Sequence, residues 1–263
     1  MKRSGWMRSG RVCGLIVGCV WATSAVAQEE STVSVGVDVP VLSSYVWRGQ
    51  VLNDDVVVQP GLTAGKAGFV VNAWSSMNVN DTETDGEFTE MDWTVSYSAM
   101  VGPVSLGAGV VQYTFPNSSL EQDDGTVVAY PGTYEVFATA GLPDMLLSPT
   151  LTVYRDLDEI DGFYGVLAVA HSFSLAEKVG LKLSASLGAG DSDYNSGYFG
   201  HDDAALNDLV VGAALPISVI ENLSITPSIS YMFLPDSDLG DAAEEAYGEK
   251  DSVYGGVTLS YAF

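Results

Sequence analysis

The chain has 263 residues with 34 acidic and ten basic side chains, which gives a formal net charge of −24 at pH 7. Such an acidic surface repels nucleic acid and excludes DNA and RNA as partners. Apolar residues make up 47% of the sequence, beside 28 glycines and 13 tyrosines, and this composition favours a folded β protein over a disordered acidic chain.

Residues 1–27 are predicted to form an export signal. Basic residues cluster before an apolar run from Val12 to Val20, and small residues then precede a cleavage site after Ala27. The stretch ending at Cys19 resembles a lipoprotein cleavage box, but the apolar run continues past it and favours cleavage after Ala27. Both cysteines, Cys13 and Cys19, would leave with the signal, so the mature chain would have no thiol or disulfide chemistry.

From residue 32 onward, polar and apolar residues alternate with a period of two, which is typical of β-strands. In the segment 89–99, for example, Met91 and Trp93 point to one face while Glu90 and Asp92 point to the other. No run in the mature chain reaches the roughly 20 apolar residues that a membrane helix needs. The alternation predicts twelve strands, at residues 32–48, 55–64, 67–77, 88–99, 103–115, 132–141, 147–156, 162–173, 179–190, 206–215, 222–233 and 252–263.

Two of these segments depart from simple alternation. In segment 103–115 the apolar residues Val110 and Val111 are adjacent, which predicts a β-bulge. Segment 162–173 is apolar on both faces, so the pattern does not say which face is outside.

The connections alternate between short and long. Those at 65–66, 100–102, 174–178 and 216–221 are short, whereas those at 78–87, 116–131, 190–205 and 234–251 are long and acidic. Outer-membrane barrels have tight turns at one end and long loops at the other, and closure satisfies every backbone polar group in lipid. We therefore predict that residues 28–263 form an all-β, transmembrane, antiparallel up-and-down β-barrel of about 12 strands.

The end of the chain supports this prediction. Leu259, Tyr261 and Phe263 share one face of the last segment, which resembles the C-terminal signal of outer-membrane proteins. We expect the protein in the cell outer membrane, with the barrel-insertion machinery recognising this strand. Outer-membrane lipid and lipopolysaccharide would be its other partners. Divalent cations gathered by the acidic loops would bridge to the lipopolysaccharide phosphates.

The stretch Ser43 to Gly49, "SSYVWRG", carries a family resemblance, together with "QPGL" at 59–62, the "GF…W-S" strand at 68–76, "YTFP" at 113–116 and "YEV" at 134–136. It resembles the TorF family of porins from Gram-negative outer membranes. The likeness covers most of the mature chain and is sharpest in residues 43–76 and 110–137. It implies a membrane barrel and a channel without an established substrate. The acidic loops and the ending "LSYAF" depart from the family pattern.

Strand parity predicts which side chains line the lumen and which face lipid. The predicted lumen charges could form a constriction that selects ions by charge, or they could pair with one another and fill a plugged lumen. The same parity directs four aromatic residues to the membrane–water boundary. The lumen residues are Arg48, Glu90, Asp92, Glu135, Lys182 and Asp208, and the boundary residues are Tyr45, Trp47, Tyr261 and Phe263.

The long loops offer one metal-like pattern. Oxygen-bearing side chains lie at Asp191, Asp193, Asn195 and Asp202, which resembles a calcium-binding loop. The glycine falls one position late for that motif and no flanking helices are evident, so a solvated acidic loop is the simpler interpretation. We therefore expect no cofactor, with Ca²⁺ at the outer loops as the alternative. Residues 235–251 are also predicted to be a surface loop, with a helical turn at 241–246.

The sequence does not predict an enzyme. His171 and Ser172 are adjacent in a strand and point to opposite faces, so they cannot form the base–nucleophile pair of a barrel hydrolase. We predict a porin-like channel for passive diffusion of small hydrophilic solutes or ions, with a preference for cations because acids predominate. A non-conducting structural, adhesion or lipid-binding barrel is the alternative. A secreted, acidic β-sandwich binding protein is the third hypothesis.

Overall fold

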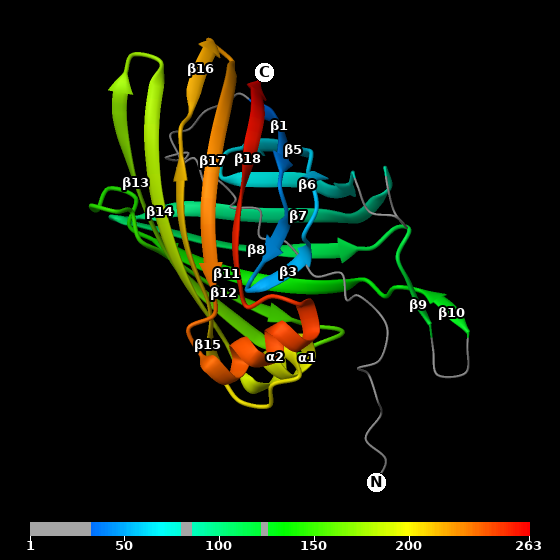
Figure 1. Cartoon of the computed structure of the whole chain (residues 1–263). Coiled ribbons are helices and arrows are strands. Elements are labelled where there is room, and N and C mark those ends of the chain that lie inside the picture. Colours follow the sequence, from blue (N-terminus) through cyan, green and yellow to red (C-terminus); the bar gives the residue numbers. More distant parts are fainter. Residues whose placement is uncertain (1–32, 80–85, 122–125) are drawn as a thin grey trace.

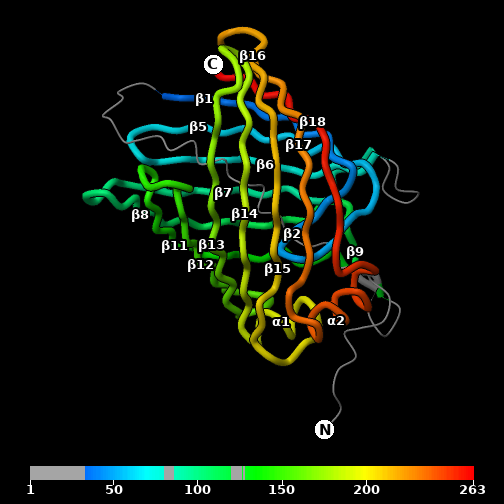
Figure 2. The backbone as a smooth tube through the Cα atoms, turned by 60° about the vertical axis from the view of Figure 1, so that its left-hand side comes forward, coloured from blue at the N-terminus to red at the C-terminus, as the bar shows by residue number. Residues whose placement is uncertain are grey.

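The computed structural model describes residues 33–79, 86–121 and 126–263, and the predicted export signal lies outside these ranges. Within them, twelve strand positions close into one antiparallel ring that keeps the sequence order (Figures 1 and 2). The last strand pairs with the first, so that Val39 lies opposite Leu259. The ring consists of β1 (Ser34–Leu42), β4 with β5 (Val57–Val58 and Gly61–Lys66), β6 (Phe69–Asn78), β7 (Phe88–Val101), β8 (Val104–Thr114), β11 (Thr133–Gly141), β12 (Thr150–Asp156), β13 (Phe163–Ala176), β14 (Val179–Gly190), β15 with β16 (Ala205–Ala214 and Ile217–Ile220), β17 (Leu223–Phe233) and β18 (Asp251–Ala262).

The alternating sequence produces a barrel whose polarity is the reverse of a soluble protein. Large apolar side chains stand exposed on the outer face, for example Phe69 at 59% and Ile229 at 58%. Serines and threonines of the same strands point to the inside, where Ser184 on β14 is exposed to the lumen. Most strands, such as β7 with 14 residues and β14 with 12, are long enough to cross a bilayer when tilted, whereas β12 has only seven residues. The fold class predicted from the alternation is therefore confirmed.

The predicted bulge at Val110 and Val111 is wrong. The register of β8 with both neighbouring strands passes through these residues without a shift. Val110 is 40% exposed on the outside, whereas Val111 is buried in the interior. Both residues are apolar because the barrel is filled at this level, so an inward side chain meets protein and not water.

The two ends of the barrel differ as predicted. Tight turns, such as Ala67-Gly68 between β5 and β6, lie at the end where the chain terminates. The opposite end carries the long connections, which include helix α1 (Ser192–Phe199), helix α2 (Ser237–Tyr247) and the small hairpin β9–β10 (Ser119–Glu121 and Val127–Ala129). The helical turn expected at 241–246 is thus part of a longer helix. No helix in the described ranges is both long and apolar enough to span a membrane.

The first strand is shorter than predicted, and this is the main correction to the fold. β1 ends at Leu42, after which β2 (Tyr45–Trp47) and β3 (Gln50–Asn53) form a separate two-stranded sheet inside the barrel. In both views this hairpin lies within the outline of the ring, in the half nearer the helices (Figures 1 and 2). It occupies the long connection between β1 and β4. Most of the remaining strand positions agree with the predicted segments to within about three residues. The segment predicted at 206–215 instead continues through β16 to Ile220, which pairs with β17, so the short connection predicted at 216–221 is wrong.

Candidate functional site

The site is built around the tip of the inner hairpin. Trp47 pairs with Gln50, which leaves Arg48 and Gly49 as a two-residue turn. Both have positive φ, 42° and 86°, as a type I′ turn requires. The first position of such a turn usually holds Asn, Asp or Gly, and another residue in the left-handed region costs about 1 kcal/mol. Arg48 is therefore explained by its side-chain contacts and not by its turn propensity.

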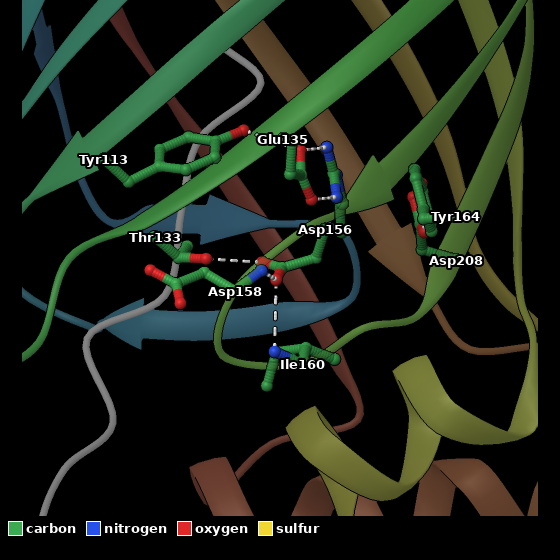
Figure 3. Close-up of polar contacts among 9 residues, drawn as sticks. Tyr113, Thr133, Glu135, Asp156, Asp158, Ile160, Tyr164 and Asp208 are labelled. Carbon is green, nitrogen blue, oxygen red and sulfur yellow. Dashed lines mark hydrogen bonds and ion pairs between the residues drawn. The ribbon is translucent and has the colours of Figure 1, made fainter.

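Arg48 makes a buried, two-bond ion pair with Glu135 of β11. Its Nη1 donates to Oε1 at 2.7 Å and its Nη2 donates to Oε2 at 2.8 Å. The side chains are 2% and 1% exposed. Tyr113 of β8 also donates to Glu135 Oε2 at 2.8 Å, which fixes the carboxylate on the wall (Figure 3). This planar fork matches guanidinium to carboxylate, and burial makes the loss of either partner expensive.

Aromatic rings surround the same guanidinium group. The Arg48 Cζ lies 4.3 Å from the ring centre of Tyr154, 4.4 Å from that of Tyr164 and 4.5 Å from that of Trp47. Tyr194 of α1 follows at 5.9 Å. Such distances are within the range of cation–π attraction, which is strongest where water is excluded. Burial raises the pKa of Tyr194, so its phenol stays neutral at physiological pH.

The predicted aromatic anchors of this segment do not face lipid. Tyr45 is 4% exposed and Trp47 is 1% exposed, both inside the barrel. Tyr45 donates from its hydroxyl to Glu90 Oε2 at 2.7 Å, and Trp47 packs edge-on against Tyr198 at 5.3 Å between ring centres. The prediction that they sit at the membrane boundary is therefore wrong, because the chain turns inward after Leu42 and reverses the environment of these side chains.

The other predicted lumen acids lie in the same closed part of the barrel. Glu90 and Asp92 of β7 are 1% and 4% exposed, and Asp208 of β15 is 4% exposed. Asp208 Oδ1 accepts from Tyr164 at 2.7 Å (Figure 3). A Cβ on Gly188 would lie 2.3 Å from both of these oxygens, so only glycine leaves room for this pair. These acids are therefore buried in the interior, and their predicted role in lining a pore remains a prediction.

Several buried polar atoms have no protein partner in the described residues. They are Glu90 Oε1, Asp92 Oδ1, both amide atoms of Gln50, Trp47 Nε1, Arg48 Nε and the Tyr194 hydroxyl. Native proteins satisfy nearly all buried polar groups, so an unsatisfied cluster calls for an explanation such as solvent or an ion. The hairpin therefore borders polar atoms that can interact with molecules entering from the lumen.

The sequence reasoning did not single out Asp156, which is 1% exposed. One of its oxygens accepts from Thr133 Oγ1 at 2.8 Å, and the other accepts from the backbone N–H groups of Asp158 and Ile160 at 2.9 and 3.1 Å (Figure 3). Asp156 therefore shapes the β12–β13 connection. The inward aromatics Tyr154 and Tyr164 were missed too, although their strand parity with Glu135 and Asp208 could have indicated them.

The remaining predicted residues lie away from this cluster. Lys182 is near the tight-turn end of β14, opposite Ser172 and Ala214. Tyr261 and Phe263 are 38% and 75% exposed on the outer face of the last strand. Their predicted role at the membrane boundary remains a prediction.

The calcium-like pattern forms the start of α1. Asp191 caps this helix by accepting from the N–H group of Tyr194 at 2.9 Å. The Asn195 amide donates to the carbonyls of Gly190 and Asp203, and its oxygen accepts from Asn207 at 2.8 Å. In the described part of the chain, no three His, Cys, Asp or Glu side chains are grouped to hold a metal ion. Asp191 and Asn195 thus have structural contacts that explain them without a metal.

A family model describes residues 26–215 of this sequence, which is most of the chain. The chain belongs to the Gcw_chp family. Its members are described as bacterial proteins of unknown function. No curated protein matches the chain.

Two solved structures have a fold similar to that of the Gcw_chp barrel. The COG4313 outer membrane channel from Pseudomonas putida F1 is 11% identical, with a TM-score of 0.53 and with 91% of this chain and 98% of that chain covered. The NanC porin is also 11% identical, with a TM-score of 0.50 and with 87% and 98% covered. At this identity the likeness concerns the fold alone.

Proposed function

We propose that the protein is an outer-membrane channel through which small hydrophilic solutes or ions diffuse passively, with a preference for cations. The observation that carries this proposal is the inverted polarity of a closed ring, apolar outside and lined with serine and threonine inside. The resemblance to the TorF family of porins suggests the same function. The structural relatives named as a channel and a porin support it at the level of the fold.

The charges in the closed half of the barrel are the basis for cation preference. Among the described residues, the buried ionisable side chains with formal charge are five acids, at positions 90, 92, 135, 156 and 208, and one base, Arg48. Because Glu135 already pairs with Arg48, acidic side chains remain in excess in this half of the barrel. A ring of carboxylates in a narrow pore attracts cations and repels anions.

The first prediction concerns this selectivity. The variant Glu90→Gln with Asp92→Asn should lose much of the cation preference, because it removes two carboxylates without changing side-chain volume. The reversal potential across a KCl gradient in a planar bilayer measures the cation preference. The matched control is Glu245→Gln with Glu249→Gln, which removes one exposed acid in α2 and one just after it. This control should keep the wild-type reversal potential. Anion selectivity of the wild type, or an unchanged reversal potential in the first variant, would contradict the proposal.

A non-conducting barrel is the second candidate, and one specific observation favours it. The inner hairpin is packed inside the loop end of the barrel. Trp47 of the hairpin and Val57 of the wall strand β4 are fully or almost fully buried. Such a plug could be permanent and the barrel purely structural. Absence of conductance in the wild type, and in every variant that weakens the hairpin contacts, would establish this alternative.

We also propose the cell outer membrane as the location, with lipopolysaccharide and the barrel-insertion machinery as partners. The exposed Tyr261 and Phe263 at the end of β18 support recognition by that machinery. No catalysis is proposed. Ser172 lies opposite Lys182, on the face away from His171, which packs against Phe173 at 4.7 Å between ring centres.

A further inference from the structure

The guanidinium of Arg48 reaches the wall opposite the strand that carries it. Counted round the twelve positions from β1, the wall strands β11 and β12 are sixth and seventh. Glu135 is on β11 and Tyr154 is on β12, whereas Arg48 follows β1 by a few residues. The hairpin therefore spans the lumen. The guanidinium group at its tip contacts a binding site formed by the strands of the far wall.

The receptor on the far wall is assembled without help from the hairpin. Tyr113 holds the Glu135 carboxylate at 2.8 Å, and Tyr164 is held by Asp208 at 2.7 Å. Tyr164 also packs against Tyr194 at 5.2 Å between ring centres, and Tyr194 against Tyr198 at 4.7 Å. These contacts preorganise a carboxylate fork flanked by aromatic faces, which we call the cation cradle: Tyr113, Glu135, Tyr154, Tyr164, Tyr194 and Asp208.

The chemistry of the cradle selects one kind of cation. Glu135 binds through two parallel N–H···O bonds, a geometry that a planar guanidinium satisfies and that a spherical ion cannot. The rings of Tyr154 and Tyr164 lie within 4.4 Å of the guanidinium carbon, and a flat cation can lie against them. The cradle therefore recognises the guanidinium group and not positive charge in general.

The occupant is attached to a hairpin that is not one of the strands of the ring. The β2–β3 hairpin is a separate sheet with no strand pairing to the barrel, and it is followed by the exposed Asp54 and Asp55. Its tip carries the strained left-handed backbone of Arg48. Buried atoms that lack a protein partner, on Gln50 and Asp92, lie around the hairpin. The Arg48 contacts hold the tip of this hairpin, beside the Tyr45–Glu90 hydrogen bond and the packing of Trp47 against Tyr198.

We propose that the cation cradle is a binding site for small solutes that carry a guanidinium group, and that Arg48 is its tethered occupant. A free guanidinium compound that enters the lumen competes with Arg48 for Glu135 and the tyrosine faces. Its binding releases the hairpin tip and opens the passage. The inference rests on the proposed channel function for the arrival of the solute, but binding to the cradle does not require conductance.

The test is chemical rescue of the full mature chain in detergent micelles. Arg48→Gly removes the tethered cation and favours the turn, so methylguanidinium should bind this variant and raise its melting temperature in proportion to concentration. The variant Arg48→Gly with Glu135→Gln should bind at least about tenfold more weakly, because it lacks the carboxylate fork. Tetramethylammonium, which cannot donate hydrogen bonds, and NaCl at equal ionic strength are the control solutes.

The outcomes separate the site from the channel. Equal stabilisation by methylguanidinium in both variants, or equal stabilisation by tetramethylammonium, would overturn the cradle. If Arg48→Gly does not fold, Arg48→Gln is measured in the same way, and the same comparison with its Glu135→Gln double variant decides. Selective binding without conductance would contradict the proposed channel function and support the cradle. Conductance without selective binding would contradict the cradle and support the channel.

Discussion

At the scale of single residues, the pair of Arg48 and Glu135 combines two features that are costly in isolation. A buried charge loses its hydration, and a non-glycine residue with positive φ strains the backbone. The two-bond geometry and the surrounding tyrosines offset both costs. The contacts of the side chain therefore determine a backbone position that local propensity would assign to asparagine.

The corresponding prediction is that Glu135→Gln destabilises the barrel by about 3–5 kcal/mol, because Arg48 is left as an uncompensated buried charge. The urea midpoint of unfolding in lipid vesicles measures this. Arg155→Gln is the matched control, since Arg155 pairs with Asp161, whose side chain is 75% exposed, and its loss should cost at most about 1 kcal/mol. An equal loss of unfolding free energy in the two variants would show that the buried pair stabilises the barrel no more than the exposed pair does.

At the scale of elements, the hairpin fills the part of the barrel nearer the helices (Figure 1). It is connected to the ring at both ends, and residues along its whole length, from Tyr45 to Val51, are buried in the interior. A Cβ at Gly49 would lie 3.4 Å from the Cβ of Asp208 on the wall. This separation is close to the about 3.5–4.5 Å of a disulfide, so the tip can be locked to the wall covalently.

We predict that the variant Gly49→Cys with Asp208→Cys forms a disulfide and holds the barrel closed under oxidising conditions. The expected mature chain has no other cysteine, so no competing disulfide should form. Conductance in a planar bilayer should rise when dithiothreitol is added. Either single cysteine variant serves as the control and should not respond to the reductant. An oxidised protein that conducts as well as the reduced one would show that the hairpin does not gate the lumen.

At the scale of the whole molecule, the distribution of polarity defines the surroundings of the protein. The outer face exposes a continuous series of large apolar side chains, with Val41, Leu62, Val257 and Leu259 on strands around the closure of the ring. Soluble monomers rarely expose contiguous apolar patches of more than a few hundred Å². A lipid environment stabilises this surface, whereas water does not.

The whole-molecule prediction is that the mature protein is extracted from membranes only with detergent and migrates differently on a gel before and after boiling. The closed ring resists unfolding by detergent at low temperature, so the unheated band should be the compact one. A cytoplasmic soluble protein analysed in parallel should show no heat-dependent shift. A protein that remains soluble and monodisperse without detergent would support the acidic β-sandwich hypothesis instead.

The barrel could be predicted from the local pattern of the sequence. Period-two alternation identifies eleven strand positions closely, because a strand's pattern depends on local residues and one of its faces must meet lipid. The succession of short and long connections shows which barrel end each connection belongs to. Inward parity also identified Glu90, Asp92, Glu135 and Asp208 as interior residues. These features depend on neighbours in the chain and on the solvent outside it.

The filling of the barrel depends on contacts that form only in the folded chain. Residues 43–48 are predicted to end the first strand, and their pattern does not distinguish lipid from a packed interior, so Tyr45 and Trp47 were assigned to the wrong side. The partners Arg48 and Glu135 are 87 residues apart in sequence, and closure of the ring brings them together. Val111 is apolar for a similar reason, because a hairpin that is distant in sequence excludes water from the barrel interior around it. Contacts across a lumen leave no periodic trace in the sequence, and for this reason the site emerged only from the fold.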